Sequence, residues 1–199
     1  MTKRSFDFFV SLIGLILLSP VFLLLICLIK LSSKGGAFYK QLRVGQHGKD
    51  FTLLKFRSMY VNSDRRGLLT VGSQDKRITP IGIFIRDYKL DELPQLINVF
   101  LGDMSLVGPR PEVRKYVELY SPEELKVLDL KPGITDLASI KYKNENDILS
   151  AQESPEQYYI EVIMPDKIKI NLSSYDLSKT VIGSIKIIII TLRAIVKRK

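Results

Sequence analysis

The longest run of apolar residues in the chain extends from Phe8 to Ile29. As a straight helix it is roughly 33 Å long, which is enough to cross the hydrocarbon core of a bilayer. The run is too long for the apolar region of a cleaved signal peptide, and no small-residue cleavage site follows it before Lys30. The pattern therefore predicts a membrane helix rather than a buried helix of a soluble protein.

A Ser19-Pro20 pair divides this apolar run near its middle. Proline has no N–H and its ring clashes with the preceding turn, so the carbonyl of Ile16 should lose its helical partner and the helix should kink. The Ser19 hydroxyl could bond the carbonyl of Leu15 and ease the break inside lipid. We therefore expect a helix-break-helix.

Basic residues flank the run on both sides, with Lys3 and Arg4 before it and Lys30 and Lys34 after it. Positive charge is retained on the cytoplasmic side of a membrane. A re-entrant hairpin that enters and leaves by the cytoplasmic face satisfies both flanks, whereas a kinked spanning helix places one flank on the opposite side. The charges favour the hairpin but leave both arrangements open.

The next segments alternate between apolar and polar positions. Residues 37–44 and 50–57, joined by a glycine-containing turn at 45–49, are typical of a β-hairpin. A polar, loop-like stretch follows at 62–77, and 78–87 is predicted to be a short helix.

A further helix is predicted to begin at Asp91, which can act as its N-cap. Pro94 fits the first turn, and Gly102 is a stop signal. Apolar residues recur at helical spacing in this segment and are predicted to be core. They are Leu93, Leu96, Ile97, Phe100 and Leu101.

The last part of the chain is predicted to be mainly helical, with helices over 111–120 and 122–128. The apolar segment 180–196 is short for a span and carries basic residues, so an amphipathic helix at the membrane interface fits it better. The predicted fold class is α/β, mostly helical with a small β-hairpin. We divide the chain into a re-entrant membrane segment at 1–34, a cytoplasmic catalytic domain at 35–179 and an interfacial helix at 180–199.

The net charge and the counts of cysteine and histidine limit the kinds of partner and active site that the protein can have. Lys and Arg number 30 against 21 Asp and Glu, and the resulting net charge of +9 favours nucleic acid, phosphorylated substrates or an anionic leaflet as partners. Cys27 and His47 are the only residues of their types. A disulfide framework within the chain is therefore excluded, and a histidine-rich zinc site or a Ser-His-Asp triad has little support.

Candidate catalytic groups gather around residue 91. Asp91 and Glu92, at a helix start, should be ionised, and such an aspartate can attack phosphorus or bind Mg²⁺. Arg57, Arg86 and Arg110 could bind phosphate in a bidentate manner. The same residues also fit ordinary helix capping, surface ion pairs and a rigid Gly-Pro-Arg-Pro turn, and spacing alone does not separate these interpretations.

Seven motifs give the chain a specific resemblance. They are Lys-Arg-Ser-Phe-Asp at 3–7, Ser19-Pro20, Lys-Phe-Arg-Ser-Met at 55–59, Thr-Pro-Ile-Gly at 79–82, Asp-Glu-Leu-Pro-Gln-Leu-Ile-Asn-Val at 91–99, Gly-Asp-Met-Ser-Leu-Val-Gly-Pro-Arg-Pro at 102–111 and Lys-Pro-Gly-Ile-Thr at 131–135. With these motifs in this order over residues 3–140, the chain resembles the bacterial sugar transferases, the small monotopic phosphoglycosyl transferases.

This resemblance implies a reaction and a location. Such enzymes move a sugar phosphate from a UDP-sugar to undecaprenyl (polyprenyl) phosphate and release UMP, at the cytoplasmic leaflet of the bacterial inner membrane. They carry out the first membrane step of a surface glycan such as an exopolysaccharide or O-antigen.

The resemblance also implies residue roles. Asp91 would be the nucleophile, carry a covalent phosphosugar and contact Mg²⁺. Glu92 would assist by positioning or by acid–base work. Arg86 and Arg110 would bind phosphates, and Ser19-Pro20 would be the break of a re-entrant helix.

The chain departs from the family pattern after residue 135. Many relatives continue Gly-Leu-Ala-Gln-Val-Asn-Gly-Arg, whereas Asp136 replaces the glycine here, Ser139 and Lys141 follow, and Asn-Gly-Arg is missing. This departure puts sugar preference and any substrate contacts of the segment in doubt.

Other functions remain open. A metal-dependent nucleotide-sugar phosphodiesterase would use the same carboxylates and pass the phosphosugar to water. A basic membrane-anchored binding or scaffold protein would explain the charge. Because Lys and Arg are spread along the chain rather than gathered in a stripe with aromatics, no nucleic-acid partner is expected. The sequence leaves the oligomeric state open, with a homo-oligomer among the alternatives.

Overall fold

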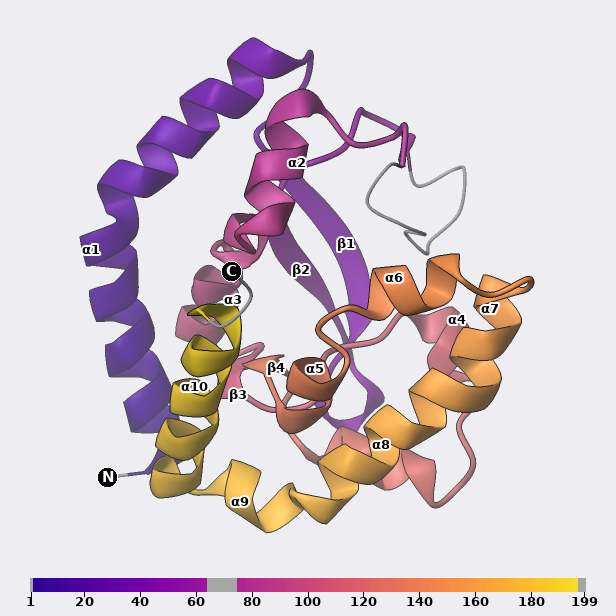
Figure 1. Ribbon diagram of the computed structural model, residues 1–199. Helices are drawn as coiled ribbons and strands as arrows, with labels where there is room; N and C mark the ends of the chain where they lie inside the picture. Colours follow the sequence, from indigo (N-terminus) through magenta and orange to yellow (C-terminus); the bar gives the residue numbers. More distant parts are fainter. Residues whose placement is uncertain (1, 64–74, 197–199) are drawn as a thin grey trace.

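The computed structural model describes residues 2–63 and 75–196 (Figure 1). Most of the predicted polar loop at 62–77 and the basic end at 197–199 lie outside these residues. The described part is mostly helical and contains two small two-stranded sheets. The predicted mostly helical fold with a β-hairpin is therefore confirmed, and the second sheet is an addition to it.

Helix α1 (Lys3–Ser32) runs along one side of the molecule and bends part-way along its length (Figure 1). Pro20 lies inside it, and the Ser19 hydroxyl donates to the carbonyl of Ile16 at 2.8 Å. The predicted break is thus a bend within a continuous helix. The predicted partner of Ser19, the Leu15 carbonyl, was wrong. Ile16 takes its place because its carbonyl is the one that Pro20 leaves without an N–H.

In the part of the chain that the structure describes, α1 is the one helix long and apolar enough to cross a membrane, by length and composition. Its apolar side chains mostly remain outside the core. Leu17 is 72 % exposed and Leu31 is 85 % exposed. A water-soluble fold normally buries such residues, so this surface needs an apolar neighbour.

The predicted hairpin is confirmed. Strands β1 (Phe38–Val44) and β2 (Asp50–Phe56) pair antiparallel, with Phe38 opposite Phe56 and Val44 opposite Asp50. His47 lies exposed in the turn with φ +57°, a conformation that a tight turn requires.

The predicted helix at 78–87 is also confirmed, as α2 (Pro80–Asp87), whose N-cap Thr79 accepts a hydrogen bond from Gly82 N at 3.0 Å. A short 3₁₀ turn over Leu90–Glu92 then precedes α3 (Gln95–Leu101).

The prediction that Asp91 caps the next helix was wrong. The N-cap of α3 is Pro94, and Asp91 lies inside the preceding turn. Lys89, with φ +56°, turns the chain just before it. The turn, rather than the start of α3, therefore sets the position of the carboxylate. Gly102 ends α3 with φ +99°, as predicted.

The prediction that the apolar stripe of α3 belongs to the core is confirmed for Leu93 and Leu96, which pack against core clusters, but not for its C-terminal end. Its buried face carries Gln95, Asn98 and Val99, while Leu101 is 65 % exposed. The C-terminal end of the stripe contacts α1, where the ring of Phe100 stacks on that of Phe8 with centroids 5.0 Å apart. A second apolar partner, α1 itself, competes for these residues.

Strands β3 (Ser105–Val107) and β4 (Gly133–Thr135) form a parallel pair that the sequence did not predict. Three-residue strands are too short to show alternation. The two backbones approach closely beyond the strands, where Gly133 N donates to Pro109 O at 2.9 Å. A Cβ atom on Gly108 would lie 2.2 Å from the carbonyl oxygen of Lys131, so the position requires glycine.

The remaining elements are short helices followed by one long helix. They are α4 (Arg114–Val117), a 3₁₀ helix (Glu124–Asp129), α5 (Leu137–Lys141), α6 (Glu145–Ser150), α7 (Pro155–Tyr158), a π-helical segment (Tyr159–Ile163), α8 (Met164–Ser173), α9 (Tyr175–Lys179) and α10 (Val181–Val196). The helices predicted at 111–120 and 122–128 are thus present but shorter, and the helix at 180–196 is confirmed.

Both terminal helices share core with the rest of the protein. Ile29 of α1 packs in one cluster with Phe56 and Ile85, and Ile187 of α10 packs in another with Val99. A third cluster joins the short C-terminal helices. The division at residues 34 and 179 stays a prediction, and these contacts attach α1 and α10 firmly to the part between them.

Candidate active site

Asn98 fixes the position of the 91–92 turn against the hairpin. Its Oδ1 accepts a hydrogen bond from Leu54 N at 3.0 Å, and its Nδ2 donates to Thr52 O at 2.8 Å. The amide thus satisfies backbone groups of β2, which pairs only with β1 among the described strands. Lys55, the next residue of β2, is thereby brought to the carboxylates.

Glu92 is held in a pair of ionic contacts. Arg110 donates to its two oxygens at 3.1 and 2.5 Å, and the Lys55 ammonium lies 3.7 Å from Oε1. Burial alone would raise the pKa of the Glu92 carboxyl, but Arg110 and Lys55 outweigh it and hold that pKa well below its ordinary value. Glu92 is therefore ionised at neutral pH.

Lys55 is a charged residue of the candidate site that sequence reasoning missed. Burial, together with the nearby Arg110, lowers the pKa of the Lys55 ammonium to about 8, although Glu92 and Asp91 oppose the shift. The signal was present, because Lys55 begins the 55–59 motif. Its meaning depends on the contact between α3 and β2, which no local pattern contains.

Asp91 differs from its neighbour. It is 7 % exposed, and no residue in the described ranges donates a hydrogen bond to its carboxylate or pairs with it. Burial raises the pKa of this carboxyl, Lys55 opposes the shift and Glu92 adds to it. Of the two adjacent carboxylates, Asp91 is the one available to react or to bind a cation.

The three predicted arginines lie in different surroundings. Arg110 is paired with Glu92, as described. Arg86 is half-buried in the last turn of α2, and its guanidinium forms no hydrogen bond or ion pair within the described residues but favours the ionised form of Asp91 electrostatically. Both are thus near the carboxylates.

Arg57 is buried and bonded to the end of α1. Its guanidinium donates to the carbonyls of Lys34, Ser33 and Ile29, the last two at 2.8 and 3.4 Å. Phosphate binding by Arg57 stays a prediction. Since its terminal nitrogens are engaged, we do not place it in the candidate site.

The Lys-Arg-Ser-Phe-Asp motif fastens the other end of α1. Lys3 donates to Val107 O at 2.6 Å and to Ser178 O at 2.5 Å, and the buried Asp7 accepts from Leu106 N at 3.1 Å. Arg4 donates to carbonyls at the end of α3. Lys3 and Arg4, predicted as flanking charges, thus join Asp7 in holding α1 on the site's scaffold.

The donor set is compatible with magnesium. No group of three His, Cys, Asp or Glu residues in the described ranges could hold a metal alone. Mg²⁺, however, commonly takes one or two protein carboxylates and completes its shell with substrate phosphates and water. The unengaged oxygens of Asp91 suit that arrangement, so the magnesium site stays a prediction that these residues fit.

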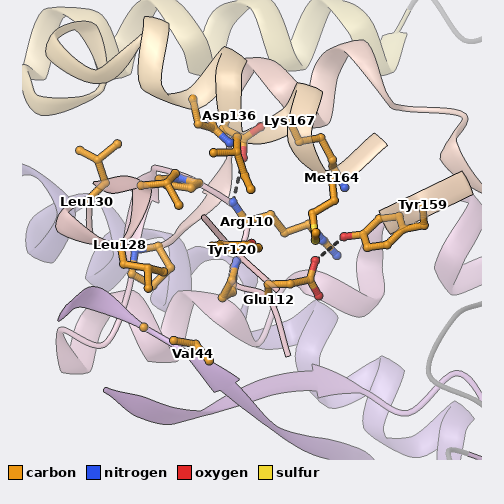
Figure 2. A pocket seen from close by; sticks show the side chains of 17 residues that line it. Val44, Arg110, Glu112, Tyr120, Leu128, Leu130, Asp136, Tyr159, Met164 and Lys167 are labelled. Atoms are coloured by element: carbon orange, nitrogen blue, oxygen red, sulfur yellow. Dashed lines mark hydrogen bonds between the residues drawn. The ribbon is translucent and has the colours of Figure 1, made fainter. Parts of the chain in front are cut away.

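A cavity is lined in part by Arg110, but the carboxylates of the candidate site, Asp91 and Glu92, do not line it. Pro109, Glu112, Asp136 and Lys167 contribute to its lining (Figure 2), whereas Asp91, Glu92 and Lys55 do not. We therefore locate the candidate site by its charged groups and not by this cavity.

The wall of this cavity contains a polar network. The hydroxyl of Tyr159 donates to Glu112, which also accepts from Arg43 at 3.1 Å, and Arg43 donates to Pro111 O at 3.0 Å. The network braces the turn that carries Arg110.

Comparisons with known proteins show which proteins the chain is similar to. A family model described as bacterial sugar transferase matches residues 1–198. The exopolysaccharide production protein ExoY of Sinorhizobium fredii is 40 % identical over 163 residues, which are 72 % of this chain and 70 % of that protein. A putative undecaprenyl-phosphate N-acetylgalactosaminyl 1-phosphate transferase of Bacillus subtilis is 46 % identical over 121 residues, which are 61 % of this chain and 68 % of that protein. The UDP-glucose:undecaprenyl-phosphate glucose-1-phosphate transferase of Escherichia coli is 38 % identical over 166 residues, covering 81 % of this chain and 36 % of that protein.

Proposed function

Since the chain belongs to the bacterial sugar transferases and is a transferase of the phosphoglycosyl type, we propose that it moves a sugar 1-phosphate from a UDP-sugar to undecaprenyl phosphate. UMP is the other product. The names of the Bacillus and Escherichia relatives support this acceptor, and the latter name supports a UDP-sugar donor. The observation that carries the proposal is the state of the two adjacent carboxylates. The buried Asp91 carboxylate has no hydrogen-bond or ion-pair partner among the described residues, whereas Glu92 is held ionised by Arg110 and Lys55.

The reaction has two displacement steps. An Asp91 oxygen attacks the β-phosphorus of the UDP-sugar, the bond from that phosphorus to the UMP oxygen breaks, and UMP leaves with the electron pair. An oxygen of undecaprenyl phosphate then attacks the same phosphorus and the bond to Asp91 breaks. The products are undecaprenyl diphosphosugar and the original carboxylate.

The surrounding charges suit this chemistry. Arg86 and the protonated Lys55 can stabilise phosphate oxygens as charge develops. Glu92 is kept ionised by Arg110 and is therefore a poor proton donor. Its role is to position the Arg110 and Lys55 cations rather than to act as an acid. A magnesium ion bound to Asp91 would reduce the repulsion between carboxylate and diphosphate.

The attachment of α1 supports a re-entrant arrangement. Lys3 and Asp7 tie its beginning to the β3 region, and Arg57 ties its end beside β2. A helix with both ends on one globular body enters and leaves a bilayer on one side, which we place at the cytoplasmic leaflet of the inner membrane. The exposed isoleucines of α10, Ile182, Ile185, Ile189 and Ile190, are suited to the interface.

The function is tested by UMP release from a panel of UDP-sugars with Mg²⁺, with and without undecaprenyl phosphate. Wild type should release UMP continuously from one sugar only when lipid is present, because without lipid the first displacement releases at most one UMP per enzyme. Asp91→Asn should lower this rate by about a thousandfold or more, because the amide is not a nucleophile. Asp87→Asn, which changes an exposed carboxylate at the end of α2, is the matched control and should retain the rate.

The outcomes separate the alternatives. UMP release that continues without lipid would establish a hydrolase instead of a transferase. Near-normal turnover in Asp91→Asn would remove the proposed nucleophile. Release that survives complete chelation by EDTA would contradict the magnesium proposal alone.

The membrane arrangement is tested with single cysteines. In a Cys27→Ser background, Thr2→Cys and Lys30→Cys mark the two ends of α1, and both positions are exposed. We expect a membrane-impermeant maleimide to label both in inside-out vesicles and neither in intact spheroplasts. Labelling of either position in spheroplasts would establish a spanning helix.

A further inference from the structure

Arg110 has an unusual local backbone. It stands between Pro109 and Pro111, and proline has no N–H. The N–H of Arg110 is therefore the only backbone donor in these three residues. It donates to Asp136 Oδ2 at 2.8 Å, and Figure 2 shows this contact beside the cavity.

The fold holds Asp136 in a fixed position beside Arg110. It directly follows β4, where Gly108 N donates to Thr135 O at 3.0 Å and brings the two segments together. Its side chain is 1 % exposed, and its second oxygen accepts from Ser139 N at 2.5 Å as the N-cap of α5. A buried carboxylate is costly without partners, and here two N–H groups satisfy it.

We propose that Asp136 is a positioning residue that sets the direction of the Arg110 guanidinium towards Glu92. This inference rests on the proposed function of Asp91 and its neighbours. Arg43 holds the carbonyl of Pro111 from the opposite end of the turn. Asp136 acts on the backbone of Arg110 itself, so its loss frees the residue that forms the fork with Glu92.

The consequence is expected in turnover. A displaced Arg110 leaves Glu92 less well paired and shifts the cations at the reacting phosphorus. Donor binding through Arg86 and Lys55 should change little. Asp136→Ala should thus lower kcat about tenfold, while the KM for the UDP-sugar stays within about twofold.

The conservative variant Asp136→Asn should lower kcat by a smaller amount. Asp136→Asn keeps one acceptor oxygen and can satisfy one of the two N–H groups. Its kcat should lie between those of Asp136→Ala and wild type. Ser121→Ala is the matched control, because the Ser121 hydroxyl also accepts from a backbone N–H at the start of a helical segment, that of Glu124, at 3.3 Å. It should lower Tm without lowering kcat.

A second background tests whether Asp136 acts through Arg110. In an Arg110→Lys enzyme, adding Asp136→Ala should lower kcat by less than about twofold, because the two changes interrupt one interaction. An additional tenfold loss there, an unchanged kcat in Asp136→Ala alone, or a parallel loss of kcat in Ser121→Ala would overturn the proposal.

Amide hydrogen exchange separates this inference from the proposed function. Exchange in the segment 105–113 should be faster in Asp136→Ala than in wild type or Ser121→Ala, whether or not the protein turns over a UDP-sugar. Unchanged protection of that segment would show that Asp136 does not hold Arg110. Absence of UMP release from wild type would instead contradict the proposed function.

Discussion

The 91–92 turn and helix α1 place their side chains in opposite ways. The turn encloses charged groups, with Asp91 7 % exposed and Glu92 paired to Arg110 and Lys55. Helix α1 leaves large apolar groups such as Leu17 and Leu24 outside. Buried charge is unfavourable unless it is paired, and exposed apolar surface is unfavourable in water. Each region is thus incomplete by itself, and on the proposed function a diphosphate completes the first and lipid the second.

Replacing Arg110 or Arg86 tests how much ion pairing contributes to stability at the 91–92 turn. Arg110→Ala should destabilise the protein by about 2 kcal/mol, because it leaves the Glu92 carboxylate, which is only 15 % exposed, without its main partner. Arg86→Ala, which removes a cation with no described hydrogen-bond or ion-pair partner, should change stability by less than about 0.5 kcal/mol and weaken donor binding instead. Tm in a nanodisc and the KM for the UDP-sugar measure the two effects. Equal Tm changes would show that the fork with Glu92 adds nothing to stability.

The pH dependence sharpens the same comparison. The pKa of Lys55 is lowered to about 8, so its positive charge is lost as pH rises through that value. If the cation stabilises phosphate, kcat/KM should fall above pH 8 by at most about tenfold per unit. Lys55→Arg should remove this decline, because arginine keeps its charge.

Stability should respond to pH with the opposite sign. An unfolded lysine titrates near its ordinary value of 10.5, above the folded pKa of about 8. Between these values the unfolded chain binds more protons, so the Lys55 contribution to the free energy of unfolding increases with pH. Activity that falls while Tm rises over this interval would identify Lys55. A decline of both, or a profile unchanged in Lys55→Arg, would assign the titration to another group.

The last prediction concerns the bend of α1. Ser19→Ala removes the only hydroxyl bonded to the Ile16 carbonyl, which Pro20 leaves without an N–H. We expect a loss of about 1 kcal/mol, measured as Tm in a nanodisc. Ser11→Ala is the control, since its hydroxyl donates to the Phe8 carbonyl in an unbroken part of the helix. An equal loss in both would mean that the bend places no special demand on Ser19.

Local patterns predicted the parts of the fold that depend on local interactions. The apolar run of α1, the alternation in the hairpin and the proline and glycine limits of α2 and α3 are all readable along the chain. Strands β3 and β4 were missed because their pairing joins segments that lie 28 residues apart, Ser105 with Gly133. The C-terminal end of the stripe on α3 was misassigned because periodicity identifies an apolar face without identifying its neighbour.

The candidate site was likewise predictable in its residue types but not in its contacts. The residue types at 91, 92, 86 and 110 indicated phosphate chemistry, whereas the engagement of Glu92 and the availability of Asp91 required the surrounding structure. Lys55 and Arg57 lie two residues apart at the end of β2, yet one approaches Glu92 and the other binds the end of α1. Only the packing of β2 between these partners distinguishes them.

The anchoring of α1 has a consequence for the order in which the protein is made. Lys3 bonds to the carbonyls of Val107 and Ser178, which follow it by 104 and 175 residues. At about 5–20 residues per second, the ribosome produces these partners many seconds after α1 has emerged. In the proposed membrane arrangement, helix α1 therefore meets the bilayer before the surface that will hold it exists.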